Sequence, residues 1–422
     1  MSRSFLKKIF GGYYHDYIES LLGFIIPQNK KVLRLNTNIE EKPTELFDYL
    51  VISDVLGYVY HIQEYLIKAK DLMKDDGRIV ITQYSSFWEP VLRLASILGL
   101  RKTLKIEQNW LGMHDLKNFA HLADLDVVKS GTKMLMPIYI PLISSFLNKI
   151  VANIFPFSRM GIFHYIVLKK HKKIDHEKVS NNLPSFSIIV PARNEAGTIE
   201  KIVQELPVLG KFTEIIFIEG NSTDNTYDEV KRVAEKYKNQ KKIKYGKQKG
   251  KGKGDAVRLG FEMAEGDILT IYDADMTVSA EEVEKFYWAI VGGKGDFING
   301  SRLVYPLEKD SMRVLNFFAN KFFSLAFSTI LDQSLKDTLC GTKVIWKKDY
   351  EDVKNNRAFF GDFDPFGDYD LLFGAAKLNL KIIDLPIHYK ERTYGVTNIS
   401  RFRHGWLLLK MVVFAARKIK FI

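Results

Sequence analysis

Two carboxylates separated by one residue, Asp273-Ala-Asp275, are the residues in this sequence with the clearest chemical potential. They follow an apolar run, residues 267–272, which predicts a buried strand. Open α/β sheets bind ligands at the carboxyl ends of their strands, where these carboxylates are expected to lie. Such oxygen ligands suit Mg²⁺ or Mn²⁺ bridging to phosphates and do not suit zinc.

Three other polar motifs precede this triplet, and each follows a predicted strand. They are Pro191-Ala-Arg-Asn-Glu195, Glu219-Gly-Asn-Ser-Thr-Asp224 and Gly252-Lys-Gly-Asp-Ala256. Each alone has a simpler explanation, such as a helix cap or a plain turn. Their order and matched spacing indicate a single site.

The elements that position these motifs alternate between strands and helices. Predicted strands cover residues 186–191, 214–219, 242–245 and 267–272, and predicted helices cover 197–206, 225–237 and 255–264. This spacing predicts a parallel, doubly wound sheet. The first half is also α/β, with predicted strands at 31–35, 47–54 and 77–82 and helices at 60–73 and 88–98.

A charged and then turn-rich stretch, residues 169–184, predicts a domain boundary. We expect a domain over 1–170, a linker over 171–182 and a second domain over 183–422, and 422 residues suffice for two domains. The single cysteine, Cys340, excludes an internal disulfide framework and a cysteine-based zinc site. A cytoplasmic location is the default expectation, since no signal peptide or spanning segment is evident.

The net charge of +12 is concentrated in two places. Residues 231–253 hold eleven basic residues and one acid, and residues 392–422 hold seven basic residues and no acid. Such patches suit phosphates, nucleic acid or an anionic membrane, and much of residues 231–249 equally fits a solvated surface. We expect peripheral contact with the inner face of the membrane. We expect no nucleic-acid partner, because no nucleic-acid-binding motif is visible.

Residues 183–422 resemble a family 2 glycosyltransferase with a GT-A nucleotide-sugar-binding fold, most closely in the dolichyl-phosphate mannose synthase branch. The four motifs above carry this resemblance. The resemblance implies a nucleotide-sugar site built from Pro191, Ala192, Arg193, Glu195, Glu219, Lys253, Asp273, Ala274 and Asp275. Thr277 stands where relatives carry another metal-contacting residue. Where the family has Asp-Asp-Gly-Ser, this chain has Glu219-Gly-Asn-Ser, which leaves the preferred base open.

The C-terminal half is expected to bind the acceptor. Arg302 lies in a segment that resembles a phosphate-contacting one, and residues 337–343 resemble an acceptor-side motif. Arg392 lies in a segment that resembles the family's closing loop, in which an arginine neutralises the diphosphate. Arg313 opens an apolar stretch that is either a core helix or lipid-facing.

The chemistry of the reaction defines roles for these residues. A departing nucleotide diphosphate would be stabilised by the metal together with Lys253, Arg302 and Arg392. A hydroxyl acceptor, as on a glycan, needs a general base, for which the candidates are Asp337, Asp368 and Asp370. Asp368 is equally a candidate for capping a helix. A polyprenyl phosphate acceptor needs no base. It needs a cationic surface, which Arg313, Arg401, Arg403 and the amphipathic stretch 406–422 would provide, although that stretch equally fits a packed helix.

Residues 1–170 resemble the C-terminal two-thirds of a class I S-adenosylmethionine methyltransferase. Residues 47–54, 76–81 and 107–111 carry the resemblance. Methyltransferases need a glycine-rich turn after the first strand, but residues 36–42 contain no glycine. We therefore expect an incomplete Rossmann-like domain that does not bind S-adenosylmethionine and is inactive as a methyltransferase.

Two other interpretations of the whole chain are a nucleotidyltransferase and a non-catalytic scaffold. A sugar-phosphate nucleotidyltransferase also ends its strands in paired aspartates, but residues 191–195 are not the glycine-rich loop that it requires. A non-catalytic scaffold of a polysaccharide biosynthesis system fits residues 1–170 better than residues 183–422, where the aspartate pair is intact.

Overall fold

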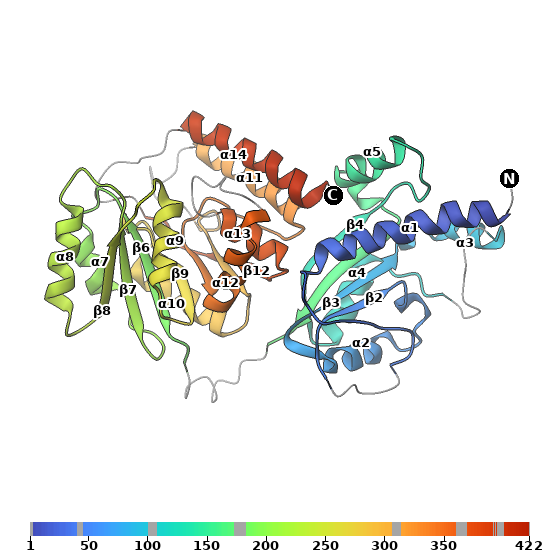
Figure 1. Cartoon of the computed structure of the whole chain (residues 1–422), viewed down its shortest axis with the longest axis horizontal. Coiled ribbons are helices and arrows are strands. Elements are labelled where there is room, and N and C mark those ends of the chain that lie inside the picture. The colour runs from blue at the N-terminus through green and yellow to red at the C-terminus, as the bar shows by residue number, and fades with distance from the viewer. Residues whose placement is uncertain are drawn as a thin grey trace. The chain divides into compact units, whose positions relative to one another are not determined.

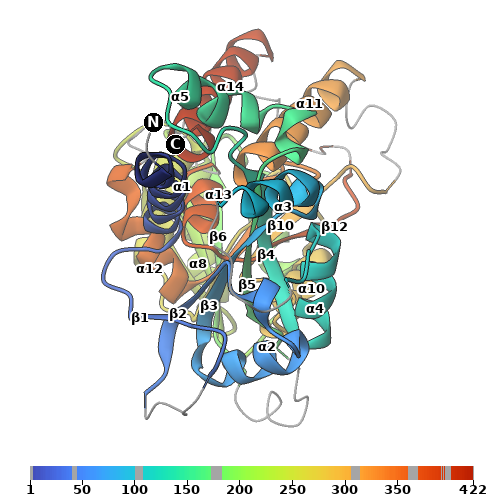
Figure 2. The ribbon, with the colours of Figure 1, turned by 90° about the vertical axis from the view of Figure 1, so that its right-hand side faces the viewer.

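The computed structural model describes residues 3–39, 45–99, 108–172, 183–305, 314–359, 369–390, 392, 394 and 401–421. The chain divides into two compact units, each with its own sheet (Figures 1 and 2). Unit 1 comprises residues 1–171 and 416–422, and unit 2 comprises residues 172–415.

The sheet of unit 1 has five strands in the order β1-β2-β3-β5-β4. β1 (Val32–Arg34), β2 (Phe47–Ser53) and β3 (Met73–Tyr84) are parallel. β5 (Phe163–Lys170) lies antiparallel between β3 and β4 (Leu125–Lys133). β5 is buried along nearly its whole length, and apart from His164 its residues are apolar up to Leu168.

Helices cover both faces of this sheet. α2 (Ile62–Asp71) and α4 (Met113–Leu122) share a core with Leu50, whereas α1 (Arg3–Ile25) shares the opposite core with Val51. Leu50 and Val51 face opposite ways because side chains alternate along a strand. The remaining elements of unit 1 are η1 (Leu56–Tyr58), η2 (Ser86–Trp88), α3 (Glu89–Ile97), α5 (Ile143–Lys149), η3 (Val151–Asn153), η4 (Phe157–Arg159) and the π-helical η6 (Ala416–Lys420).

Unit 2 contains a seven-stranded sheet in the order β12-β10-β11-β9-β6-β7-β8. Its strands are β6 (Phe186–Ala192), β7 (Thr213–Glu219), β8 (Lys242–Lys247), β9 (Ile268–Ile271), β10 (Phe297–Ser301), β11 (Lys343–Trp346) and β12 (Ile382–Pro386). β6, β7, β8 and β9 are parallel, as the alternation of strands and helices predicts. The sheet as a whole is mixed, because β11 pairs antiparallel with both β9 and β10.

The direction of β11 matters for the site. Because β11 runs opposite to β9, the start of β11 lies at the edge where β9 ends; Val344 pairs with Thr270. The loop that precedes β11 is thereby brought to the carboxyl end of β9, beside the aspartate pair.

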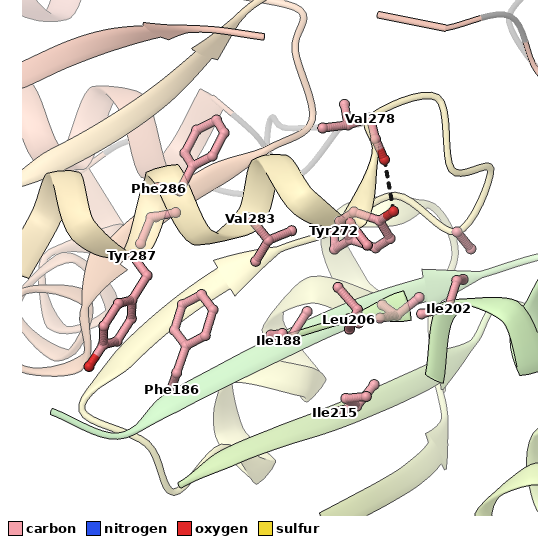
Figure 3. Packing of buried hydrophobic residues seen from close by; sticks show 14 of the residues in the cluster. Phe186, Ile188, Ile202, Leu206, Ile215, Tyr272, Val278, Val283, Phe286 and Tyr287 are labelled. Atoms are coloured by element: carbon pink, nitrogen blue, oxygen red, sulfur yellow. Dashed lines mark hydrogen bonds between the residues drawn. The ribbon is translucent and has the colours of Figure 1, made fainter. Parts of the chain in front are cut away.

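A continuous apolar core anchors the sheet of unit 2 (Figure 3). Phe186 and Ile188 of β6 are fully buried with Ile202 of α7 (Ile199–Glu205) and Phe286 of α10 (Ala280–Val291). Burying one such side chain contributes about 1.5–3 kcal/mol. The hydroxyl of Tyr272, directly after β9, donates to the carbonyl of Val278 at 2.7 Å, which fixes the turn that contains Asp273 and Asp275.

The other helices of unit 2 are α8 (Thr226–Tyr237), α9 (Lys253–Met263), α11 (Val314–Leu331), α12 (Lys347–Asn355), η5 (Arg357–Phe359), α13 (Tyr369–Lys377) and α14 (Arg401–Ala415). α11 and α14 pack against each other. Within the residues that the structure describes, no helix combines the length and apolar character needed to cross a bilayer.

Candidate functional site

The polar motifs gather at the carboxyl edge of the unit 2 sheet, and two loops there are tied together. Asn194, after β6, adopts a left-handed conformation with φ 57°. Its backbone N–H donates to Ser222 Oγ at 3.1 Å, and its side-chain oxygen accepts from the Thr223 N–H at 2.8 Å. Asparagine tolerates this conformation better than most residues. Asn194 therefore locks the loop after β6 to the loop after β7.

Asp273 lies in a crowded, cationic setting. Lys253, the first residue of α9, places its ammonium 2.6 Å from Asp273 Oδ1. Burial alone would raise the pKa of Asp273, but Lys253, with Lys343 and Arg302 beyond it, lowers that pKa below its usual range. Gly341, in the loop before β11, lies so close that a Cβ built on it would be 2.0 Å from Asp273 Oδ2.

Asp275 is held from two sides. One oxygen accepts hydrogen bonds from the Thr277 hydroxyl at 2.9 Å and the Thr277 N–H at 3.2 Å. The other oxygen lies 2.8 Å from Arg392 Nη2. Arg392 comes from a segment distant in sequence and also contacts Glu195, with Nη1 3.1 Å from Oε1. Arg392 thus bridges Asp275 and Glu195.

Glu195 is an unusual carboxylate at this edge. It is only 5% exposed, and its Oε2 has no hydrogen-bonding partner among the described residues. Burial raises the pKa of Glu195 to about 7, with Asp275, Asp224 and Asp273 adding to the shift and Arg392 opposing it. A buried carboxylate oxygen without a partner is costly unless a ligand or proton satisfies it.

The residues expected to line the nucleoside are adjacent in the structure. Ala192 pairs with Glu219 across β6 and β7, and Pro191 pairs with Ile218. Glu219 accepts a hydrogen bond from the Ser222 N–H at 2.5 Å. Arg193 is exposed and passes over Gly220, where an added Cβ would be 3.2 Å from the Arg193 Cβ.

Arg302 and Asp337 form a buried pair behind this edge. The guanidinium donates two hydrogen bonds to the carboxylate, at 2.7 and 2.9 Å, and the Arg302 backbone N–H adds one at 3.0 Å. Asn320 of α11 adds another at 2.8 Å. Although burial opposes it, Arg302 lowers the pKa of Asp337 to about 2. These contacts suit a positioning role for Asp337 better than the role of a general base.

Asp370, in the first turn of α13, lies in an arginine cluster. Its Oδ2 is 3.8 Å from Arg258 of α9 and 3.8 Å from Arg357 of η5. Two other candidates, Asp368 and Arg313, lie outside the described residues.

Two residues at this edge had no contact with the aspartate pair or with Asp337 predicted from the sequence: Lys343, the last residue of the acceptor-side motif 337–343, and Asn299. Lys343 is 1% exposed, donates to the carbonyl of Cys340 and contributes to the low pKa of Asp273. Asn299 donates to the Asp337 carbonyl at 2.7 Å and to Asp384 at 2.6 Å. The signal for Lys343 was its place at the end of the acceptor-side motif 337–343. The role of Asn299 depends on strand neighbours that the sequence does not reveal.

Unit 2 is therefore an α/β domain that gathers carboxylates and cations at the carboxyl edge of its sheet. Residues 187–353 match the model of the family described as glycosyl transferase family 2.

Similar proteins include curated glycosyltransferases. Glycosyltransferase AglD of Haloferax volcanii is 26% identical over 227 residues, which cover 51% of this chain and 34% of that protein. Dolichol-phosphate mannosyltransferase of Pyrococcus furiosus is 26% identical over 248 residues, which cover 56% of this chain and 66% of that protein. The matches thus span from about a third to about two-thirds of these relatives. Among solved structures, glucosyl-3-phosphoglycerate synthase from Mycobacterium tuberculosis in complex with UDP is 17% identical, with a TM-score of 0.41, and the match covers 56% of this chain and 80% of that one.

Proposed function

We propose that this protein transfers a sugar from a nucleotide diphosphate donor to a polyprenyl phosphate, in a metal-dependent, inverting reaction. The observation that carries this proposal is the pairing of Asp273 with Lys253 and of Asp275 with Arg392 at the sheet edge. Each carboxylate that would bind the metal is thereby in contact with one cation that would bind the diphosphate. The match of residues 187–353 to the glycosyl transferase family 2 model supports the same reaction class.

The donor set fits Mg²⁺ or Mn²⁺ that is shared with a diphosphate. Within the described ranges, no group of three or more His, Cys, Asp or Glu side chains is arranged to hold a metal unaided. Mg²⁺ commonly binds through one or two carboxylates together with substrate phosphates. Asp273 and Asp275 would supply the carboxylates, and Thr277 would orient Asp275 through its hydrogen bond. When bound, the metal would neutralise charge on the diphosphate.

The reaction that we propose is a direct displacement. An acceptor phosphate oxygen forms a bond to the anomeric carbon, the bond from that carbon to the diphosphate oxygen breaks, and the electron pair leaves with the nucleotide. Lys253 and Arg392 would exchange their carboxylate partners for the departing diphosphate. Arg302, fixed by Asp337, would add positive charge behind Asp273.

The contacts of the candidate general bases with arginine side chains support a phosphate acceptor over a glycan hydroxyl. A hydroxyl must lose a proton to a base, whereas a phosphate oxygen is already anionic. Of the three candidates, Asp337 is buried against Arg302, and Asp370 lies in the cluster of Arg258 and Arg357. The similarity to a dolichol-phosphate mannosyltransferase points to the same acceptor chemistry.

The test is nucleotide release from a panel of GDP- and UDP-sugars with Mn²⁺, with and without undecaprenyl phosphate. We expect release from one donor that depends on both the metal and the lipid phosphate. Asp275→Asn should reduce release at least about 100-fold, whereas Asp228→Asn, at an exposed position of α8, should leave it unchanged. Release that requires a glycan and ignores the lipid would instead select the hydroxyl acceptor, and no release from any donor would refute the proposal.

For unit 1 we propose a methyltransferase-like scaffold that does not bind S-adenosylmethionine. β1 is only three residues long and lies at the edge of the sheet, whereas in complete Rossmann-like domains the strand that carries the cofactor turn lies inside the sheet. Calorimetric titration of the full chain with S-adenosylmethionine should give no binding heat. Saturable binding would contradict this part of the proposal.

A further inference from the structure

We propose that residues 139–160 of unit 1, here called the apolar cap, dock this protein on an anionic lipid surface. The proposal does not depend on the reaction proposed for unit 2. Leu142 is 86% exposed and Phe155 is 69% exposed, which is rare for side chains of this kind. The exposed large apolar residues of the cap are Tyr139, Ile140, Leu142, Ile143, Phe146, Ile150, Ile154, Phe155, Phe157 and Met160.

Helix α5, at the centre of the cap, buries its polar face and exposes its apolar face. It buries Ser144 and Asn148 completely, whereas Ile143 and Phe146 are 51% and 55% exposed. A surface helix of a water-soluble domain normally buries its apolar stripe and exposes its polar one. The inverted pattern fits a helix whose outer environment is apolar.

Buried hydrogen bonds hold the cap in this orientation. Asn148 Oδ1 accepts from the N–H groups of Leu135 and Met136, both at 2.9 Å, and its Nδ2 donates to the Met136 carbonyl at 2.8 Å. Ser144 accepts from the Ile140 N–H at 2.7 Å and donates to the Ile138 carbonyl at 2.6 Å. Turning the apolar side chains inward would break these bonds and leave buried polar groups unpaired, which costs about 1–3 kcal/mol each. The apolar side chains are therefore held outward.

The positive charge of the cap indicates that its partner is anionic. No aspartate or glutamate occurs between Asp126 and Asp175, whereas Lys149 and Arg159 lie exposed within the cap. Exposed apolar and aromatic side chains together with basic ones are the combination that binds interfaces of anionic lipid.

Helix α3 extends the apolar surface next to the cap. The indole N–H of Trp88, at the end of η2, donates to the Met160 carbonyl at 2.6 Å and joins the two segments. α3 has no buried residue, and its Val91, Leu94 and Ile97 are 54–82% exposed.

A second copy of this chain fits the cap less well than a lipid surface does. A two-fold dimer brings the same patch of both copies together. The Lys149 and Arg159 side chains of both copies would then lie in one apolar contact, and residues 139–160 include no aspartate or glutamate to pair with them. Like charges in such a contact are destabilising, whereas anionic headgroups neutralise both.

The experiment is vesicle flotation of the full chain with neutral phosphatidylcholine vesicles and with vesicles containing about a third phosphatidylglycerol. The cap variant carries Leu142→Ser, Phe146→Ser and Phe155→Ser. Its matched control carries Tyr60→Ser, Leu122→Ser and Val208→Ser, which are also exposed but lie outside the cap. We expect the cap variant to bind at least about tenfold more weakly to both vesicle types and the control to bind like the wild type.

A charge variant tests the choice of lipid separately. Lys149→Gln with Arg159→Gln should weaken binding to anionic vesicles about 30-fold and leave binding to neutral vesicles unchanged, since each cation contributes about 1 kcal/mol at an anionic surface. Circular dichroism spectra and melting curves of all variants should match the wild type. Absence of vesicle binding, or equal binding of the wild type and the cap variant, would overturn the proposal. One further result would overturn the proposal. The wild type would be a dimer in size-exclusion chromatography, and the cap variant would lose the dimer but still bind vesicles.

Discussion

At the scale of single residues, Gly341 sets how closely the loop before β11 approaches the aspartate pair. A Cβ at this position would lie 2.0 Å from Asp273 Oδ2 and 2.4 Å from Lys253 Nζ. We expect Gly341→Ala to displace the Asp273 carboxylate and to lower nucleotide release about 10- to 100-fold, because small misplacements of reacting groups are costly. Release with Mn²⁺ and the preferred donor is the measurement.

Gly23→Ala is the matched control, because a Cβ at Gly23 in α1 meets no atom within 4 Å. It should leave nucleotide release unchanged and stabilise α1 slightly. Gly341→Ala should keep a wild-type circular dichroism spectrum, since the atoms it meets belong to side chains that can move. Wild-type release by Gly341→Ala would contradict the close approach.

The raised pKa of Glu195 predicts a pH-dependent stability of unit 2. Its value of about 7 in the folded state lies above the ordinary value of 4.5. The stabilising contribution of the protonated form is thus complete below pH 4.5 and is lost as the pH rises through 7. The free energy of unfolding of the wild type, relative to Glu195→Gln, should fall by about 2 kcal/mol between pH 5 and pH 8.

Urea titrations without metal, followed by hydrogen exchange of residues 186–219, measure this difference. Glu200→Gln is the control: Lys236 and Arg232 lower the pKa of this partly exposed carboxylate to about 2, so its ionisation does not change in this range. A constant difference between the wild type and Glu195→Gln across the range would show that Glu195 is ionised throughout.

At the scale of elements, the sequence predicted the first part of unit 2, from β6 to β9, well. Every strand and helix predicted between residues 186 and 272 is present, with ends shifted by a few residues, because the strands are apolar runs closed by turn residues. The antiparallel direction of β11 was not predictable, since it depends on the path of the chain after β10. Nor was the bridge from Arg392 to Asp275, which joins residues 117 positions apart. Local sequence patterns do not indicate which distant residues are in contact.

Helix α5 shows a second limit of the sequence, because its polar residues are the buried ones. We expect Asn148→Leu to leave the N–H groups of Leu135 and Met136 without their acceptor and to destabilise the cap by about 2–4 kcal/mol. Hydrogen exchange of residues 135–150 should accelerate accordingly. Asn118→Leu, at an exposed position of α4, is the control and should leave this exchange unchanged. Unaltered exchange in Asn148→Leu would mean that other contacts fix the cap.

At the scale of the whole molecule, the two units have separate apolar cores. The core of unit 2 is built around β6, whereas unit 1 has a core on each face of its own sheet. A ligand that binds one folded unit stabilises that unit by mass action. Mn²⁺ together with the nucleoside diphosphate of the preferred donor should therefore raise the unfolding midpoint of unit 2 alone.

Hydrogen exchange during urea unfolding resolves the two units through residues 186–192 and 163–170, which form β6 and β5. At a ligand concentration about 100 times the dissociation constant, the free energy of unfolding of unit 2 should increase by about 2.7 kcal/mol. The exchange of β5 should stay unchanged, and Asp275→Asn should remove the effect on β6. An equal shift of both strands would mean that the units unfold as one cooperative body, in which case unit 1 would share the stability that the ligand gives to unit 2.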